Sequence, residues 1–409
     1  MLKAAKATPG TRASINLNLD RLLEAIRTEG YTVYGPTLAT PDGESGSDPI
    51  GAAAFREVRS VSDLAVGVRS EWSAGRARVH ADAGGLVFSL LLSPSSAKGL
   101  LFPPRQNLWS GRLEGQRLDI EPPTAVRETR RIAILGLRAC DLAAVLILDR
   151  VLVEGPYPDP AYRAARERSL LIAVDCRQPH ETCFCTSVGG KPYPSDGFDL
   201  RVTELGDGAD RRFLIEAGSP KGEAVLVRAF ESQPKGQDLV DRDAQNLAAE
   251  AAVTRRFSAD GLKEAMYASA ESPVWNDIAE RCLACGNCTM VCPTCFCTTV
   301  TDTSSLDGTV ARDRVWDSCF NADFSYIHGG SVRQSTASRY RQWITHKLAA
   351  WQDQFGTIGC VGCGRCVAWC PAGIDIAAEA CRIQRAHHRP DRPDPADNSN
   401  HPPPETQEP

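Results

Sequence analysis

Two cysteine motifs with the same spacing constrain this chain more than any other part of its sequence. The pattern C-x2-C-x2-C-x3-C-P occurs at residues 282–293 and again at residues 360–371. A tight loop with a cysteine at every third residue can direct three thiolates at three iron atoms of one cubane. One such run could be a zinc knuckle or a disulfide scaffold. Two identical runs predict a redox protein with two [4Fe–4S] clusters.

The bacterial two-cluster ferredoxin pattern assigns each thiolate to a cluster, because the fourth cysteine of each run reaches the other cluster. We expect the first cluster to be held by Cys282, Cys285, Cys288 and Cys370, and the second by Cys360, Cys363, Cys366 and Cys292. Residues 293–359 form a long insert, for which we expect a hairpin followed by a long helix. Loop-closure entropy grows slowly with length, so the insert is tolerated. Its length also leaves local ligation open as the alternative.

A second set of cysteines lies in the N-terminal half. Cys140 and Cys176 follow two apolar runs that predict strands, and Cys183 and Cys185 lie in the loop after the second. A predicted helix joins the strands, so they should be parallel and end at one edge of a sheet. The four thiols could therefore hold a third [4Fe–4S] cluster. A tetrahedral zinc site and a set of buried free thiols are the alternatives.

Further thiols follow the first motif in the segments PTCFC and WDSC. Cys295, Cys297 and Cys319 could lie beside a cluster or form a small site, but buried thiols of this kind are more often packing residues. Cys381 stands alone after the last motif and is expected to be structural.

The sequence predicts an α+β fold whose N-terminal mixed α/β domain precedes a helical dicluster ferredoxin-like domain. Apolar runs predict strands of one mixed sheet at 31–36, 53–58 and 85–92. Runs at 131–138 and 169–176 predict the strands of a βαβ-like unit, and runs at 199–205 and 211–217 predict a hairpin. The expected segments are a flexible arm at 1–15, the α+β domain at 16–238, a helical linker at 239–257, the dicluster domain at 258–385 and a disordered tail at 386–409.

Composition excludes several classes of function. The 409 residues are 42% hydrophobic with a net charge of -5, which gives no basic footprint for nucleic acid. No apolar stretch is long enough to span a bilayer, and no secretory signal is recognisable. The 16 cysteines are therefore expected to be reduced or metallated in a cytoplasmic protein. No P-loop or dinucleotide fingerprint occurs, so no catalytic residues are predicted.

Several segments together resemble a known family. They include GLRACDLAAVLILDRVL, CFCTSVGGKPYPSDGFDLRVTEL, RCLACGNCTMVCPTCFCTTV, RVWDSCF and IGCVGCGRCVAWCPAGIDI. The chain resembles the iron–sulfur beta subunit of cytoplasmic sulfhydrogenase-type [NiFe] hydrogenases from about residue 15 to 385. It is equally similar to the electron-transfer subunit of anaerobic sulfite reductase, which shares the 4Fe–4S dicluster architecture. The N-terminal cysteine quartet also fits the family pattern.

The resemblance implies a non-catalytic electron-transfer subunit of an oxidoreductase complex. One expected partner is a flavin-bearing, NAD(P)-reactive gamma subunit. The other is a catalytic partner, either the small and large subunits of a [NiFe] hydrogenase or a sirohaem sulfite reductase subunit. A metal-stabilised scaffold without a redox role is the alternative from another class.

Overall fold

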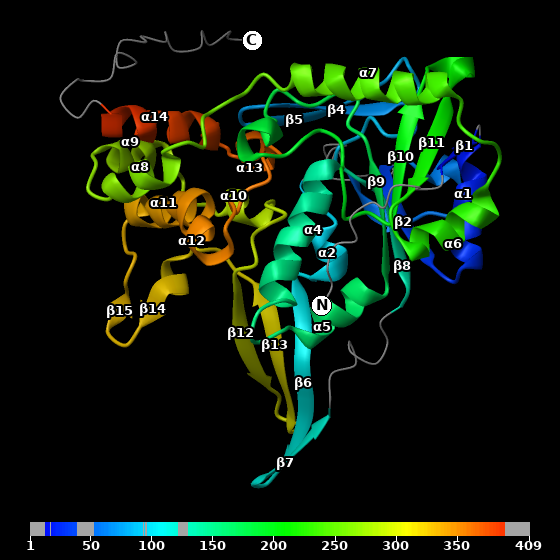
Figure 1. The fold of residues 1–409 in the computed structure, drawn as a ribbon. Helices are drawn as coiled ribbons and strands as arrows, with labels where there is room; N and C mark the ends of the chain where they lie inside the picture. Colours follow the sequence, from blue (N-terminus) through cyan, green and yellow to red (C-terminus); the bar gives the residue numbers. More distant parts are fainter. Residues whose placement is uncertain are drawn as a thin grey trace, which may run out of the picture.

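The computed structural model describes residues 13–16, 18–38, 53–92, 94, 96–121 and 130–388. Most of the arm at 1–15 and of the tail at 386–409 lies outside these residues. The chain combines helices with mixed sheets, as the α+β prediction requires, and Figure 1 shows a sheet-containing half beside a half built mainly of helices.

A seven-stranded mixed sheet forms the core of the N-terminal half, with the order β1-β11-β10-β9-β8-β2-β3. The four strands β10, β9, β8 and β2 run parallel, and the outer strands pair antiparallel. The strands are β1 (Ala13–Asn16), β2 (Thr32–Leu38), β3 (Ala53–Glu57), β8 (Ile132–Leu137), β9 (Ser169–Val174), β10 (Leu200–Leu205) and β11 (Arg212–Ala217). The strands predicted at 31–36, 53–58, 131–138, 169–176, 199–205 and 211–217 are confirmed. Strand β1 was not predicted, because it begins within the segment expected to be a flexible arm, and it forms by pairing with β11.

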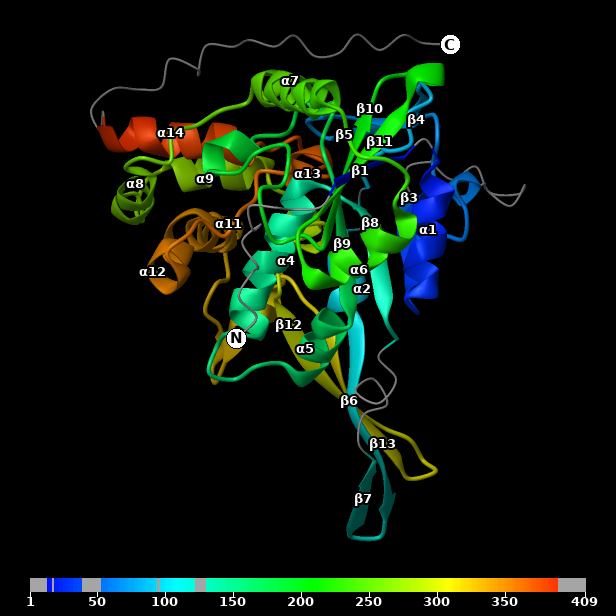
Figure 2. The ribbon, with the colours of Figure 1, turned by 45° about the vertical axis from the view of Figure 1, so that its right-hand side comes forward.

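Helices cover both faces of this sheet, as Figure 2 shows. Helices α1 (Leu19–Thr28) and α6 (Pro220–Ala229) pack together on one face. Helix α4 (Ala139–Leu152) packs on the other. The reason lies in β8, where Ala133 and Leu135 point to the α1 side and Ile134 and Leu137 to the α4 side. Both faces of β8 are therefore apolar and buried.

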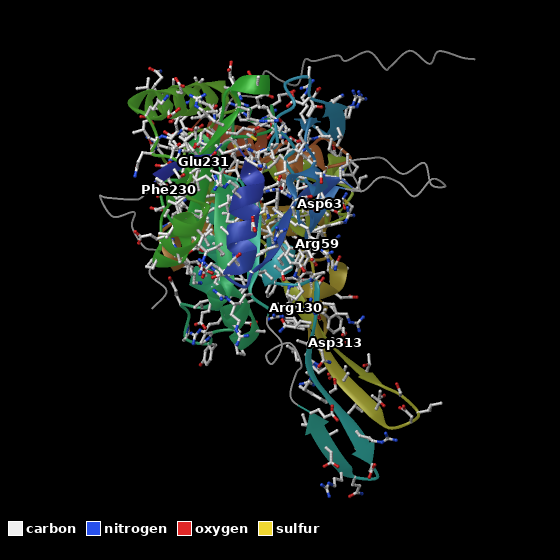
Figure 3. The ribbon with its side chains drawn as sticks, turned by 90° about the vertical axis from the view of Figure 1, so that its right-hand side faces the viewer. Arg59, Asp63, Arg130, Phe230, Glu231 and Asp313 are labelled. Carbon is white, nitrogen blue, oxygen red and sulfur yellow. The ribbon has the colours of Figure 1, made fainter. Side chains whose placement is uncertain are left out.

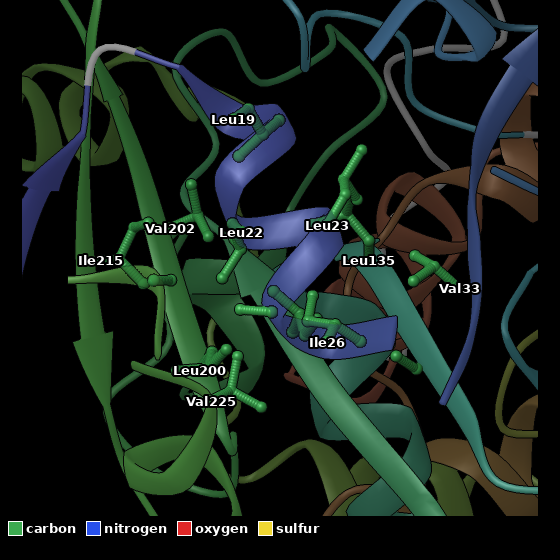
Figure 4. Close-up of a cluster of buried hydrophobic side chains, with 14 of the residues drawn as sticks. Leu19, Leu22, Leu23, Ile26, Val33, Leu135, Leu200, Val202, Ile215 and Val225 are labelled. Carbon is green, nitrogen blue, oxygen red and sulfur yellow. The ribbon is translucent and has the colours of Figure 1, made fainter. Parts of the chain in front are cut away.

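Helix α1 illustrates how the sequence determines an element. The Asn18 side chain accepts a hydrogen bond of 2.8 Å from the Asp20 backbone N–H and so caps the helix. Leu22, Leu23 and Ile26 recur at helical spacing and are fully buried against the sheet, as Figure 4 shows. Burial of each such side chain stabilises the fold by about 1.5–3 kcal/mol.

Residues 85–92 are not a strand, so the prediction made there from an apolar run is wrong. The segment is irregular, although most of its side chains are buried. Its backbone groups find side-chain partners instead of a neighbouring strand. The Glu204 carboxylate accepts hydrogen bonds from the N–H groups of Val87 at 2.9 Å and Phe88 at 3.1 Å, and Ser70 Oγ accepts from Leu91 N–H at 2.9 Å. Apolar periodicity cannot reveal such pairing, because it reports burial and not the hydrogen-bond partner.

The C-terminal half is mainly helical and has its own apolar core, to which Leu262, Ile278, Trp343 and Ile383 belong. The helices from residue 236 onward are α7 (Gly236–Ala252), α8 (Leu262–Ala268), α9 (Val274–Arg281), α10 (Asn287–Met290), α11 (Thr336–Thr345), α12 (Trp351–Phe355), α13 (Arg365–Ala368) and α14 (Ile376–His388). A π-helical turn, His346–Ala350, joins α11 to α12. None of the helices in the described ranges is both long enough and apolar enough to cross a membrane.

A second sheet joins the two halves, with the order β12-β13-β6-β7. Strands β12 (Thr298–Ser304) and β13 (Thr309–Trp316) form the hairpin predicted for the insert, and β13 pairs with β6 (Arg105–Glu114) from the N-terminal half. Asp313 of β13 accepts hydrogen bonds from Arg105 and Asn107 of β6, and Figure 3 shows this sheet projecting from the body. The insert is thus anchored to the N-terminal half.

Shorter elements complete the chain. These are β4 (Val68–Ser73), β5 (Arg76–Ala81), α2 (Lys98–Leu101), β7 (Arg117–Glu121), α5 (Pro160–Glu167), β14 (Tyr326–Ile327) and β15 (Gly330–Ser331). The hairpin of β4 and β5 packs near α13, where Gly75 N–H donates to Val367 O at 3.1 Å.

Replacement of Glu204 by alanine tests the account of the irregular segment. It leaves two buried N–H groups without an acceptor, so we expect Glu204→Ala to lower the free energy of unfolding by roughly 2–4 kcal/mol. Glu57→Ala, on the exposed end of β3, is the control and should change it by less than about 0.5 kcal/mol. Urea denaturation followed by circular dichroism measures both. Equal changes in the free energy of unfolding would contradict the conclusion that Glu204 is the hydrogen-bond partner of this segment.

Candidate metal centres

The two cysteine loops share one backbone conformation. In the first loop Ala284 has a left-handed φ of 50°, and its N–H donates to Cys282 Sγ at 3.4 Å. In the second loop Gly362 has a φ of 64°, and its N–H donates to Cys360 Sγ at 3.4 Å. Each loop then continues through a second left-handed residue, which is Gly286 in the first loop and Gly364 in the second. A short helix follows, α10 in the first loop and α13 in the second. The repeated spacing in the sequence therefore corresponds to a repeated turn that directs backbone N–H groups at the sulfur atoms.

The first cavity combines both motifs. Cys282, Cys285 and Cys288 line it from the first loop and Cys370 from the second. These four thiols are the set expected when the fourth cysteine crosses over. Cys366 also borders the cavity. Four thiolate donors that converge on one cavity fit a cubane cluster.

The walls of this cavity are aromatic on one side and open on the other. Phe320, Tyr340 and Trp343 line it, and the Tyr340 and Trp343 rings lie 5.3 Å apart in an edge-to-face arrangement. Cys285 is exposed, and the neighbouring Leu283 side chain is 69% exposed. The first site is therefore close to the protein surface.

Cys292 lies close to the thiols of the second motif. Burial raises the pKa of Cys366 well above its usual value, and the neighbouring thiols Cys360, Cys363 and Cys292 add to the shift. Burial also raises the pKa of Cys360 to about 12. These thiols are thus near enough for their charges to interact, and a metal that binds them must displace their protons.

The N-terminal quartet also meets at one cavity. This cavity is lined by Cys140, in the first turn of α4, by Cys176, just after β9, and by Cys183 and Cys185. Burial raises the pKa of Cys185 to about 12 and that of Cys140 well above its usual value. The parallel strands β8 and β9 bring these thiols together as the sequence predicted, and the donor set fits a cluster with four thiolates.

A zinc ion would need the four sulfur atoms at about 2.3 Å from a single point. Within the described ranges, no group of three or more histidine, cysteine or carboxylate side chains is placed to hold one ion. A cubane differs in its demand, because each thiolate binds a separate iron atom.

The quartet loop and the second cysteine loop are in direct backbone contact. Phe184 N–H donates to Gly362 O at 2.8 Å, and Cys183 Sγ lies 3.8 Å from Cys363 O. Cys363 and Gly362 also line the quartet cavity. A Cβ atom on Gly362 would lie 2.5 Å from the Cys185 backbone, so this approach requires a glycine.

Arg365 occupies the space between the two sites. It is fully buried, with Nη2 2.8 Å from Asp141 Oδ1 and Nε donating to Leu92 O at 3.1 Å. Burial opposes its charge, but Asp141, Cys363 and Cys140 outweigh burial and raise the pKa of the guanidinium. The side chain therefore remains cationic and is neutralised locally by Asp141.

The remaining cysteines near the first motif form contacts with one another. A hydrogen bond from Cys319 is the main cause that lowers the pKa of Cys297 to about 7. Cys295 contacts Cys292 in the same way. Cys381 lies on α14, with its Sγ 3.9 Å from Arg256 O.

Sequence reasoning missed the charged residues around these thiols. Lys347, Lys98 and Arg365 are each no more than 4% exposed. Arg365 could have been suspected because it lies inside a cysteine motif. Lys347 and Lys98 carry no such signal, since a lysine on a helix is ordinarily exposed.

Gly362→Ala tests the contact between the loops. Gly373→Ala is a matched control, since Gly373 has a φ of 63° but its added Cβ would meet nothing nearer than 3.7 Å. In both variants the left-handed conformation of the new alanine lowers the free energy of unfolding by about 1–2 kcal/mol. We expect Gly362→Ala to lose at least twice as much as the control in urea denaturation, because backbone must also move. Equal losses would show that the close approach does not matter.

Comparisons with known proteins identify a domain that contains both cysteine motifs and a relative that matches most of the chain. Residues 281–374 match the family model of the 4Fe–4S dicluster domain. The sulfhydrogenase 2 subunit beta of Pyrococcus furiosus is 32% identical over 281 residues, which are 67% of this chain and 80% of that protein. No solved structure matches the chain significantly.

Proposed function

Because the chain belongs to the family of the sulfhydrogenase beta subunit, with its 4Fe–4S dicluster domain, we propose that it is an electron-transfer subunit of a [NiFe] hydrogenase. It relays single electrons between the hydrogen-activating subunits and a flavin-bearing, NAD(P)-reactive subunit. The complex is cytoplasmic. None of the 16 cysteines, all of which lie in the described ranges, forms a disulfide, which is consistent with a reducing compartment.

One observation carries the proposal, namely that the thiols form a continuous series across the chain. Cys366 of the second motif borders the first cavity, and Cys363 of the same motif borders the quartet cavity. The second motif thus lies between the other two sites. Bound [4Fe–4S] clusters supply one-electron carriers whose potentials depend on hydrogen bonds, charge and exposure.

In this proposal the protein holds three clusters through distinct ligand sets. The first set is Cys282, Cys285, Cys288 and Cys370, the second is Cys360, Cys363, Cys366 and Cys292, and the third is Cys140, Cys176, Cys183 and Cys185. The aromatic wall of the first cavity excludes water from its inner side. The buried Cys363 and Arg365 keep the middle of the series away from solvent.

The two ends of the series supply docking places for partners. At one end are the exposed Cys285 and Leu283. At the other end the exposed Lys191 lines the quartet cavity together with Pro192. Electrons can therefore enter at one surface and leave at another, which a scaffold without a redox role would not require.

Iron analysis combined with a double substitution tests the ligand sets. Three cubanes correspond to about twelve irons per chain. We expect Cys183→Ser with Cys185→Ser to remove about four of them, while the first two cubanes keep their EPR signals after reduction with dithionite. Cys381→Ser is the control and should retain all of the iron. About eight irons in the unmodified chain, or zinc in their place, would contradict the third cluster. A chain without reducible signals would contradict the relay.

Isolation of the native complex tests the partners. The complex should contain nickel and flavin, since the proposed neighbours are the hydrogen-activating and the NAD(P)-reactive subunits. Metal analysis and absorption spectroscopy of the affinity-purified complex measure both. Sirohaem without nickel would instead assign the chain to an anaerobic sulfite reductase.

A further inference from the structure

Lys347 is a buried lysine that points at a proposed cluster ligand. It lies in the π-helical turn between α11 and α12, a type of turn that often marks functional sites. Its side chain is almost fully buried, with Nζ 3.2 Å from Cys292 Sγ and 3.0 Å from Thr294 Oγ1. The Lys347 carbonyl oxygen accepts a hydrogen bond of 2.7 Å from Gly359 N–H, which fixes the turn against the second cysteine loop.

Lys98 approaches the same cysteine from the N-terminal half. Its Nζ donates to Cys292 O at 3.0 Å and to Cys295 O at 3.1 Å, and it lies 3.7 Å from the centre of the Trp316 ring. Lys98 is 4% exposed. Two buried lysines thus approach Cys292, Lys347 at its sulfur atom and Lys98 at its carbonyl oxygen.

Thiolates are the available counter-charges for these lysines. In the described part of the chain, neither ammonium group forms an ion pair with a carboxylate. A buried charge without a partner is strongly unfavourable, so this arrangement indicates that negative charge resides on the sulfur atoms.

The first cavity lacks such a charge, because the residues that line it include no lysine or arginine. The quartet cavity is lined by Arg138 and Lys191, and Arg365, between the second and third sites, is neutralised by Asp141. Buried positive charge therefore distinguishes the second ligand set from the first.

We propose that Lys347, reinforced by Lys98, raises the reduction potential of the second cluster above that of the first, so that an electron shared by these two clusters resides preferentially on the second. The inference rests on the proposed function. Reduction adds one electron to the cluster, supplied by a neighbouring cluster or by a redox partner, and no bond to Lys347 is made or broken. The reduced state carries one more negative charge, which a nearby buried cation stabilises.

An EPR-monitored redox titration of Lys347→Met in the full chain tests the proposal. We expect the midpoint potential of the second cluster to fall by at least about 59 mV, which for one electron is a tenfold change in the equilibrium constant. The first cluster, identified by the change that Cys285→Ser causes in its signal, should keep its midpoint. Lys263→Met removes an exposed lysine paired with Asp353 and should leave both midpoints unchanged.

Lys98→Met provides a second route if Lys347→Met fails to assemble the cluster. The Lys98 ammonium contacts carbonyl groups and not the sulfur, so we expect a smaller fall in the same midpoint. Lys347→Arg keeps the charge and should hold the midpoint near that of the unmodified protein. If Lys347→Met binds its full complement of iron and its midpoint potential is unchanged, the proposal is overturned. If Lys347→Met does not bind iron, an unchanged midpoint potential in Lys98→Met overturns it instead. Neither of these results contradicts the proposed electron-transfer function, because the clusters would still be reducible.

Discussion

The organisation of the protein depends on the backbone contact between the second cysteine loop and the quartet loop. The hydrogen bond from Phe184 N–H to Gly362 O joins a loop of the sheet domain to a loop of the dicluster domain. Gly364 makes a similar approach, since a Cβ atom there would lie 2.3 Å from Thr182 O. With glycine at both positions, the backbones of the two loops can approach each other closely. The two halves of the chain, whose largest apolar clusters are distinct, are thereby coupled at the point where their thiols meet.

The long insert contributes to the same coupling. Strand β13 pairs with β6 of the N-terminal half, and Arg314 of β13 forms an ion pair with Asp159 at the start of α5. The insert then returns through α11 and the π-helical turn, which delivers Lys347 to the second ligand set. Residues that separate the two motifs in the sequence therefore hold the two halves together in space. The loop between the motifs has a structural role beyond connecting them.

Cysteine spacing was sufficient to predict the ligand candidates, and the pattern of apolar residues was sufficient to predict most strands of the large sheet. The runs at 282–293 and 360–371 encode one turn twice, and the strand–helix–strand pattern places Cys140 and Cys176 at one sheet edge. Residues 85–92 could not be predicted, because the partner of their backbone is Glu204, which is distant in the sequence. The same holds for Lys347. Its burial depends on thiols that only the fold brings near, and a π-helical turn has no compositional signature.

The central claim is that the clusters form one connected series with the second cluster in the middle. EPR spectroscopy of the fully reduced chain tests it most directly. The account predicts about three unpaired electrons per chain, one for each cubane, with signals broadened by magnetic interaction between neighbours. Removal of the quartet cluster through Cys183→Ser and Cys185→Ser should narrow the signal of the second cluster and leave that of the first unchanged. Sharp, non-interacting signals in the unmodified chain would contradict the account.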